Sequence, residues 1–380
     1  MDIQKSNEVL VVVQLTGGND FMNTIVPYTD HNYYDFRSNL AIPEENILKI
    51  DSELGFPEFA RSFFHEYENG NMAIIQGVGY PNSSRSHFRG MDIWHTCVPE
   101  TIADEGWLGK VVRELDPRKE NPLTAVSIGQ GLPRALSAKE VTITSVLDLD
   151  NYGLMSDLKD INTKNNTLDA FKKIYGQAIG TGLVRDYIAS TGLDLLRGAE
   201  ILKKAPENYC SDVEYAQNPI ANSLKDIARI HLADLGTRIF YAQHGGYDTH
   251  ATQLAVHPKL LQELTRAIMD FFEDLRNHNA SEEVVMLVFS EFGRRIKDNG
   301  SGTDHGSGGG AFLIGDRVEG GLYGQYPSLE LADLANGEDM GFNIDFRGVY
   351  STLLDQWLGL DASPIVNGTY EQISPFKKDY

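Results

Sequence analysis

The stretch that decides the fold is Val9–Leu15, VLVVVQL, which is followed by the polar segment Thr16-Gly17-Gly18-Asn19-Asp20. A continuous apolar run rich in β-branched residues is typical of a strand that is buried on both faces of a parallel sheet. The two glycines after it allow the chain to turn sharply. The sequence therefore predicts a central strand that ends in a polar loop carrying Asp20.

Similar apolar runs recur along the chain, and segments with helical spacing separate them. The further predicted strands are Met72–Val78, Thr124–Ile128, Thr237–Gln243, Glu283–Phe289 and Gly310–Ile314. The main predicted helices are Phe56–Glu68, Phe88–His95, Trp107–Leu115, Ser223–Leu235, Gln253–Arg276 and Tyr350–Leu358. This alternation predicts an α/β fold with a mostly parallel central sheet and helices on both faces. Ligands bind at the carboxyl ends of the strands in such folds.

No linker, internal repeat or low-complexity tract divides the 380 residues. We therefore expect a single domain over residues 1–380, although the length alone would allow two or three. Residues 133–222 are more polar and mostly helical in pattern. We interpret them as a helical insertion or cap within that domain.

The chain carries 33 basic and 54 acidic residues, which gives a formal net charge of −21. This balance argues against nucleic acid as a partner, because binding a polyphosphate needs a basic face. It leaves an anionic small substrate open, since local charge from arginine and metal can outweigh the global field. No apolar run reaches the roughly 18–20 residues that a membrane span needs. The oligomeric state is not visible in the sequence.

The two cysteines, Cys97 and Cys210, are far apart and lack the spacing of metal ligands. That excludes a cysteine zinc cage and a disulfide scaffold, and it leaves open a single bridge between them. The first predicted strand begins near Val9, so no room remains for a signal peptide. We expect a cytoplasmic protein as the chain stands, or a periplasmic one if an export segment has been removed.

Polar clusters next to the predicted strands carry residue types that bind metals. Asp20 follows the first strand and is interpreted as a carboxylate ligand or, alternatively, as a turn or helix-capping residue. Asp248 and His250 follow the strand Thr237–Gln243. In an extended segment residues two apart face the same way, so both could reach one metal. The alternative is that Asp248 caps the next helix.

Two further clusters follow in the C-terminal half of the chain. Glu291 directly follows a predicted strand and has Arg294 close behind, an arrangement that suits a metal-bound carboxylate with an oxyanion-holding arginine. The alternative is a structural ion pair. Asp304 and His305 lie in Gly300–Gly310, which has six glycines in eleven residues. Such a loop is costly to order and suits a close approach to a ligand or a lid. The alternative is a plain hairpin loop.

The segment Asn82–His87 is the candidate for a nucleophile. Its serines, Ser83, Ser84 and Ser86, follow a predicted strand and lead into a helix. Amide groups at a helix start bind anions, and a metal can deprotonate a nearby serine. The alternative, which does not exclude the first, is that Ser86 caps the helix that begins near Phe88.

With these segments in this order, the chain resembles the bacterial family known as domain of unknown function DUF1501. That family is placed in the alkaline phosphatase-like superfamily, together with the sulfatases and the cofactor-independent phosphoglycerate mutases. The resembling segments span nearly the whole chain: LVVVQLTGGND (10–20), GVGYPNSSRSHFRGMDIW (77–94), IFYAQHGGYDTHATQ (239–253), VVMLVFSEFGRR (284–295), GTDHGSGGGAFLIG (302–315) and DFRGVYSTLLDQWLG (345–359).

The resemblance implies an alkaline phosphatase-like fold with two divalent ions (zinc, manganese, magnesium or calcium) at the top of the sheet. The implied ligands are Asp20, Asp248, His250, Glu291 and His305, with Asp304 as an additional ligand or a partner of one. Ser290-Glu291 stands where the superfamily has an Asp-His pair. Losing one imidazole favours an ion harder than zinc at one position.

The resulting hypothesis is a metal-dependent hydrolase or transferase that acts on a phosphate or sulfate ester of a small molecule or saccharide. Ser86 would attack, with Ser83 and Ser84 as alternatives, and Arg85, His87 or Arg294 would hold the ester oxygens. The Cys-x-Pro-x-Arg motif of sulfatases is absent, which argues against a formylglycine mechanism. The alternatives are a catalytically inactive metal-binding protein with a binding or assembly role, and a hydrolase of another bond.

Overall fold

The structure, a computed structural model, describes residues 7–150, 161–179 and 183–378. Its main sheet contains β1 (Val9–Thr16), β4 (Met72–Gly79), β5 (Ala125–Ile128), β6 (Thr144–Val146), β7 (Ile239–Gly245), β8 (Val284–Ser290), β9 (Gly309–Ile314), β10 (Gly321–Tyr323) and β11 (Ile344–Asp345). A separate antiparallel pair consists of β2 (Ile47–Lys49) and β3 (Gly55–Pro57).

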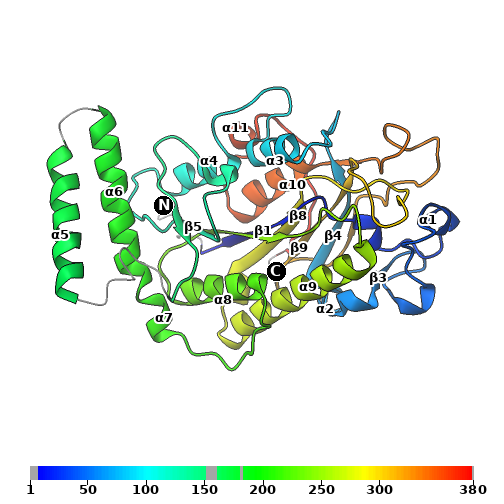
Figure 1. The fold of residues 1–380 in the computed structure, drawn as a ribbon, viewed down its shortest axis with the longest axis horizontal. Helices are drawn as coiled ribbons and strands as arrows, with labels where there is room; N and C mark the ends of the chain where they lie inside the picture. The colour runs from blue at the N-terminus through cyan, green and yellow to red at the C-terminus, as the bar shows by residue number, and fades with distance from the viewer. Residues whose placement is uncertain (1–6, 151–160, 180–182, 379–380) are drawn as a thin grey trace.

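Most of the described helices cover the two faces of this sheet, and α5 and α6 lie at one end (Figure 1). They are α1 (His31–Phe36), α2 (Arg61–Glu68), α3 (His87–Thr96), α4 (Trp107–Leu115), α5 (Ile161–Ala178), α6 (Leu183–Leu202), α7 (Ala205–Asn208), α8 (Pro219–Leu232), α9 (Gln253–Asn277), α10 (Phe346–Thr352) and α11 (Ser363–Val366). A π-helical turn, Leu353–Trp357, continues α10.

The nine-stranded sheet has the order β10-β4-β9-β8-β1-β7-β5-β6, with β11 paired to β4. Every pairing is parallel except those of β9, which runs antiparallel to both β4 and β8. The predicted α/β class and mostly parallel sheet are confirmed. The antiparallel direction of β9 was not predicted.

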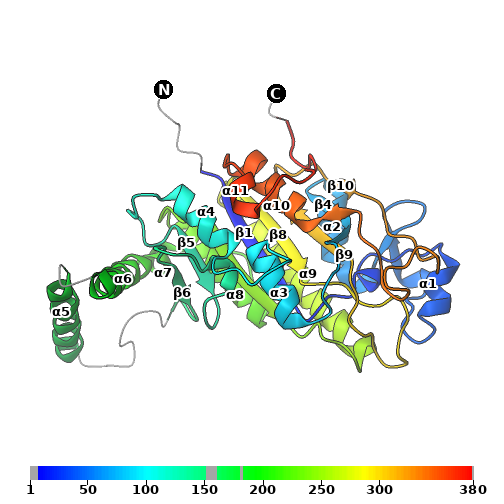
Figure 2. The ribbon, with the colours of Figure 1, turned by 90° about the horizontal axis from the view of Figure 1, so that it is seen from above.

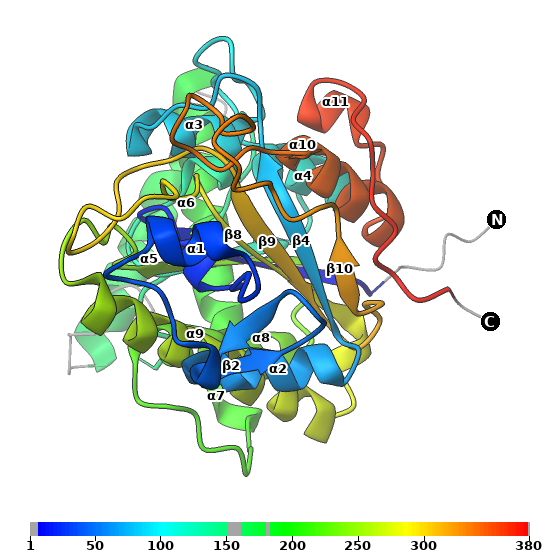
Figure 3. The ribbon, with the colours of Figure 1, turned by 90° about the vertical axis from the view of Figure 1, so that its right-hand side faces the viewer.

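Both faces of the sheet are covered, which explains the unbroken apolar run of β1. Val11 and Val13 belong to the core beneath α2, α8 and α9, whereas Leu10 and Val12 belong to the core beneath α3, α4 and α10. Figure 3 shows these two groups of helices on opposite sides of the strands. Because successive side chains of a strand point to opposite faces, both alternating sets of positions in a central strand are mostly apolar. The buried exception in β1 is Gln14, whose side-chain oxygen accepts from the Tyr241 hydroxyl.

The carboxyl ends of β1, β7 and β8 lie together, since these strands are parallel neighbours. Thr16 pairs with Gly245, and Leu15 pairs with Ser290. Because β9 runs in the opposite direction, its first residue, Gly309, lies at the same edge. The loops after three strands and the loop before a fourth therefore converge there.

Three predicted helices begin four or five residues from the predicted position, and one of them, Ser223–Leu235, begins at Pro219 as α8. The segment predicted as the helix Phe56–Glu68 first contributes β3, and α2 begins only at Arg61. Pro57 has no amide hydrogen and disfavours helical geometry at the residue before it, which delays the helix. The C-terminal helix begins earlier than predicted, at Phe346, because the Asp345 side chain accepts a hydrogen bond from the Arg347 amide and caps it.

Helices α5 and α6 pack against each other and lie at one end of the molecule in Figures 1 and 2. They fall within residues 133–222, as does β6, which extends the main sheet. Residues 151–160 and 180–182 of this segment lie outside the described residues. The interpretation of 133–222 as an insertion in a single domain stays a prediction.

Cys97 is buried and Cys210 is exposed, and both are free thiols, so no bridge joins them. Among the described residues, none of the helices combines the length and the apolar character that crossing a lipid bilayer requires.

Candidate metal centre

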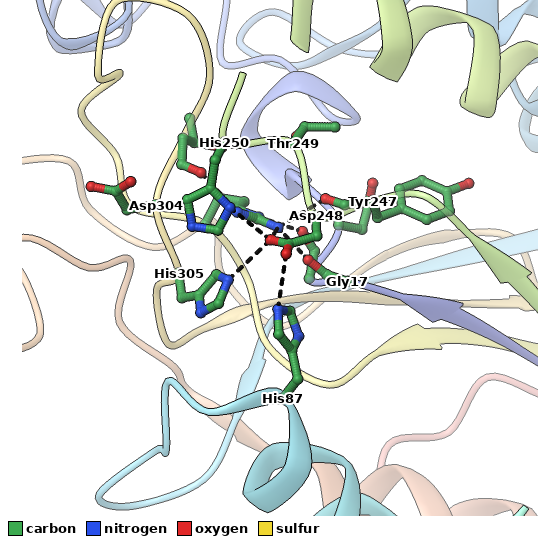
Figure 4. Close-up of polar contacts among 12 residues, drawn as sticks. Gly17, His87, Tyr247, Asp248, Thr249, His250, Asp304 and His305 are labelled. Atoms are coloured by element: carbon green, nitrogen blue, oxygen red, sulfur yellow. Dashed lines mark hydrogen bonds and ion pairs between the residues drawn. The ribbon is translucent and has the colours of Figure 1, made fainter. Parts of the chain in front are cut away.

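Three histidines surround the carboxylate of Asp248 at the carboxyl edge of the sheet (Figure 4). Nδ1 of His250 and Nε2 of His305 lie 2.9 and 3.0 Å from Asp248 Oδ1. Nε2 of His87 lies 3.4 Å from Oδ2. Three possible ligand atoms, one each from His87, Asp248 and His305, lie within 4.8 Å of one another. Within the described part of the chain, no other set of three or more histidine, cysteine or acidic side chains has this spacing. The Asp248 side chain is 48% exposed, so the cluster is open to solvent.

Three segments that meet at the same edge of the sheet supply the cluster. His87 is the first residue of α3, which follows β4. Asp248 and His250 follow β7, and His305 lies in the loop that enters β9. The glycines of that loop permit close packing of backbone on backbone, because a Cβ at Gly306 would lie 2.6 Å from the carbonyl carbon of Arg294.

The outer nitrogens of two imidazoles are held by hydrogen-bond acceptors. Nδ1 of His87 lies 2.8 Å from Glu291 Oε1, and Nδ1 of His305 lies 2.8 Å from the carbonyl oxygen of Arg85. Because both partners accept, both Nδ1 atoms donate. Each Nε2 therefore presents either a lone pair to a cation or a second proton to Asp248. Histidines that bind metals are commonly oriented in this way.

The buried Nε2 of His87 makes no hydrogen bond within the described residues. The hydrogen bond from Nδ1 to Glu291 raises the pKa of His87, against the effect of burial. A buried polar atom without a partner costs free energy, and a cation held between His87, Asp248 and His305 would satisfy it. Imidazole nitrogens with a carboxylate oxygen form a suitable donor set for a divalent transition-metal ion.

Arg294 fixes Asp248 from beneath. It is buried, and its guanidinium donates to Asp248 Oδ1 at 2.7 Å and to the carbonyl oxygens of Gly18 and Thr303, each at 2.7 Å. Partial burial acts to raise the pKa of Asp248, but hydrogen bonds from Arg294 and a neighbouring imidazole hold it well below its usual range. The predicted contact of Arg294 with ester oxygens would require these protein contacts to break.

Glu291 contacts the cluster through His87. Its Oε1 also accepts from the Gly17 amide at 2.9 Å, and its Oε2 accepts from the Ser290 hydroxyl at 3.1 Å. Burial acts to raise the pKa of Glu291, but the hydrogen bond from His87 is the larger of the opposing effects that lower it. The carboxylate is therefore ionised, and its role as a direct ligand stays a prediction.

The structure does not bring Asp20 into the cluster. Its carboxylate pairs with Arg37, with Arg37 Nη2 lying 3.0 Å from Oδ1, and Oδ2 accepts from the side-chain nitrogen Nε2 of Gln253. Asp20 and Arg37 are 1% and 0% exposed. Arg37 also donates to the carbonyl oxygens of Arg295 and Ile296. A ligand role for Asp20 would require this buried pair to open.

Asp304 points away from Asp248 (Figure 4). Its carboxylate lies 3.2 Å from Asn299 Nδ2 and 3.7 Å from an Arg295 nitrogen. The adjacent residues of this Asp-His pair thus face different surroundings, and only His305 joins the cluster.

The candidate nucleophiles lie at the start of α3. Ser86 is exposed and precedes the helix, but its hydroxyl makes no capping hydrogen bond. The Ser86 amide donates to the Ser84 hydroxyl at 3.2 Å, and the Ser83 hydroxyl is buried without a partner within the described residues. Arg85, which was predicted to hold ester oxygens, pairs instead with the buried Asp339 at 2.8 Å. The choice among the serines stays open.

Residues that the sequence did not indicate also shape the site. The Phe292 ring packs against the imidazoles of His87 and His305, with ring centroids 4.9 and 5.0 Å apart. Its position directly after Glu291 was the only available signal. Arg37 and Asp339 lie in polar stretches without a metal-binding pattern, and only the folded chain reveals their contacts.

We expect Gly17→Ala to destabilise the protein and disturb the site. Gly17 has φ +121°, and an added Cβ would lie 2.3 Å from the Asp248 amide nitrogen. The backbone strain alone costs roughly 1–3 kcal/mol. Gly129→Ala is the matched control, because Gly129 has φ +133° but open space around its Cα. Urea denaturation should show a larger loss for Gly17→Ala, and equal losses would contradict the steric argument.

No curated protein matches the chain. Among solved structures, an alkaline phosphatase superfamily protein from Vibrio parahaemolyticus is 8% identical, with a TM-score of 0.39 over 86% of this chain and 64% of that one. PsFucS1 sulfatase from Pseudoalteromonas sp. is 11% identical, with a TM-score of 0.39 over 97% and 70%. Lipoteichoic acid synthase LtaP from Listeria monocytogenes is 7% identical, with a TM-score of 0.37 over 84% and 66%.

The chain spans less than two thirds of the Vibrio protein and of LtaP, and TM-scores below 0.4 assign no activity to it. The family model described as "Protein of unknown function (DUF1501)" matches residues 55–368, which confirms the resemblance predicted from the sequence. The chain belongs to the DUF1501 family.

Proposed function

We propose that the protein binds a divalent metal ion through His87, Asp248 and His305 and uses it to hydrolyse or transfer a phosphate or sulfate ester. The supporting observation is the convergence of two Nε2 atoms on Asp248, while Glu291 and a backbone carbonyl hold the outer nitrogens. His250 offers a further imidazole beside the same carboxylate.

The donor set favours zinc or manganese over magnesium or calcium, because imidazole suits transition metals and hard ions prefer oxygen. Because Ser290-Glu291 replaces an Asp-His pair, the pattern implied by the resemblance lacks one imidazole. His87, at the start of α3, supplies an imidazole from another segment. A second ion would need further ligands, and Asp20 is engaged with Arg37. The proposal therefore requires one ion, and the second stays a prediction.

When bound, the ion would polarise an ester oxygen and lower the pKa of an attacking hydroxyl. The chain supplies the rest of the site. Helix α3 begins at His87, and the backbone amides of its first turn have no partner within the helix. An anionic ester would be favoured next to these amides. Ser86, exposed at that helix start, is the proposed nucleophile. The open cluster leaves room for a small-molecule or saccharide ester.

The test combines metal content with turnover. Purified wild type should contain near-stoichiometric metal by mass spectrometry, and His305→Ala should lose it. Wild type should also cleave p-nitrophenyl phosphate or p-nitrophenyl sulfate, and Ser86→Ala should retain metal without turnover. Metal without turnover in wild type would favour an inactive metal-binding protein. Absence of metal after reconstitution would overturn the proposal.

Glu291→Gln should weaken zinc binding by roughly 10–100-fold, the usual effect of removing a carboxylate that orients a metal-binding histidine. Glutamine can still accept from His87 Nδ1, but it lacks the negative charge that makes the imidazole a better donor to metal. Competition with a chromophoric chelator would measure the change. Asp304→Asn is the control, because that carboxylate points away from the cluster (Figure 4). A loss in the control equal to that of Glu291→Gln would contradict this assignment.

A further inference from the structure

We propose that Asp339 is a positioning residue for the metal centre, acting on His305 and His87 through Arg85 and Ser307. This inference rests on the proposed function of that centre. Asp339 lies in the loop formed by residues 334–341, which contributes no member of the cluster. Its carboxylate joins the two segments that carry the metal-binding histidines.

One oxygen of Asp339 gathers contacts from both segments. Oδ2 accepts from Arg85 Nε at 3.0 Å and Nη2 at 2.8 Å, and from the Ser307 hydroxyl at 2.7 Å. Arg85 stands two residues before His87, and Ser307 stands two residues after His305. Asp339 is 0% exposed and Arg85 is 33% exposed, so the carboxylate that accepts these charge-assisted hydrogen bonds is removed from water.

The link from Arg85 to His305 is direct. The Arg85 carbonyl accepts from His305 Nδ1 at 2.8 Å, which directs Nε2 toward Asp248. Because Asp339 anchors the Arg85 side chain, it also limits where the Arg85 carbonyl can lie. His305 therefore keeps its ring orientation through a chain of two contacts that begins at Asp339.

Backbone contacts hold the loop of residues 334–341 against the His305 segment and against Ile296. The Gly308 amide donates to the Met340 carbonyl at 3.0 Å, and the Ile296 amide donates to the Glu338 carbonyl at 3.2 Å. A Cβ at Gly308 would lie 2.1 Å from the Gly341 carbonyl oxygen, so the packing is close. The loop thus forms a fixed support, and Asp339 is its charged contact with the histidine segments.

A buried ion pair that served only stability would affect unfolding but neither the tautomer of His305 nor metal affinity. Asp339→Asn separates the two roles, because it keeps the shape of the side chain and removes its charge. Glu338→Gln is the matched control one residue away. Glu338 is half-exposed and lies 3.8 Å from Arg85, but the structure records no contact of its carboxylate with Ser307.

The experiment uses the 380-residue chain and two measurements. Zinc affinity is determined by competition with a chelator, and ¹⁵N-histidine NMR of the metal-free protein reports the tautomer of His305. Asp339→Asn should lower zinc affinity by about tenfold. This is the low end of the effect of removing a group that orients a metal ligand, because Asp339 acts on His305 only through Arg85 and Ser307. It should also mix the His305 tautomers. Glu338→Gln should change neither.

Zinc affinity within twofold of wild type together with an unchanged His305 tautomer would overturn the inference while leaving the metal site intact. Failure of wild type to bind zinc would overturn the proposed function, and the inference with it. Should Asp339→Asn not fold, Arg85→Lys replaces it, since lysine keeps the charge but cannot make the two-nitrogen contact with Oδ2. The same loss of affinity and tautomer mixing is then expected, and wild-type values for both would overturn the inference.

Discussion

Asp248→Asn is expected to bind zinc at least about 100-fold more weakly than wild type, because removing an outer partner of a metal site already costs roughly 10–100-fold. Asp248 is the one carboxylate that faces all three imidazoles. Without its charge, the positive Arg294 guanidinium, 2.7 Å from Oδ1, would remain close to the ion and oppose its binding. Chelator competition at constant ionic strength would measure the loss.

The control for this prediction must separate lost ligation from lost folding. Circular dichroism should show that Asp248→Asn keeps the fold, because the cluster is half-exposed and the loops around it are also held by the carbonyl contacts of Arg294. Thr249→Val changes the neighbouring buried residue without touching the cluster and should keep wild-type affinity. Zinc affinity of Asp248→Asn within threefold of wild type would remove Asp248 from the metal site.

The sequence predicted that Asp248 and Glu291 lie near one another, because parallel strands bring their carboxyl ends to one edge. Glu291 directly follows one predicted strand, Asp248 lies a few residues after another, and these two strands flank β1. The carboxyl ends of neighbouring parallel strands meet at one edge, so side chains distant in sequence converge there. The same reasoning placed the segment that contains His87, although the role predicted for that residue differed from the one proposed here.

The role of each carboxylate could not be predicted, because pairing depends on contacts between distant residues. Asp20 has the residue type and the position of a ligand, yet Arg37 neutralises it in the core. Glu291 also follows a strand, but the His87 imidazole lies between it and Asp248. Neither Arg37 nor the rotation of His87 leaves a signal in local sequence.

The direction of β9 was a second feature beyond the reach of strand patterns. Its apolar residues fit a parallel or an antiparallel neighbour equally well. The connection from β8 to β9 contains no helix, and a parallel connection would need a crossover, usually helical. The glycine-rich loop of residues 300–310 already indicates in the sequence that no helix connects these two strands. The antiparallel direction places His305 at the edge where the cluster lies, because β9 begins rather than ends there.

Asp20→Asn should destabilise the protein by about 3–5 kcal/mol, the usual cost of removing one partner from a buried ion pair. Arg37 would keep its carbonyl contacts, but its charge would lie in the core without compensation. Urea denaturation monitored by tryptophan fluorescence would measure the free energy of unfolding. The zinc content of the folded fraction should stay at the wild-type level. A variant that loses zinc but keeps wild-type stability would instead show that Asp20 is a ligand.

The pH dependence and a double variant test the cause of that destabilisation. Burial opposes ionisation of Asp20, but Arg37 lowers its pKa below the ordinary value. A carboxylate with a lowered pKa contributes stability above its unfolded-state pKa of about 4, and the contribution is lost as the pH falls further. The difference in unfolding free energy between wild type and Asp20→Asn should therefore shrink in acid.

The double variant Asp20→Leu/Arg37→Met removes both charges and should be more stable than Asp20→Asn, because no uncompensated charge remains in the core. A double variant less stable than Asp20→Asn would show that packing around these side chains, rather than their charge, dominates.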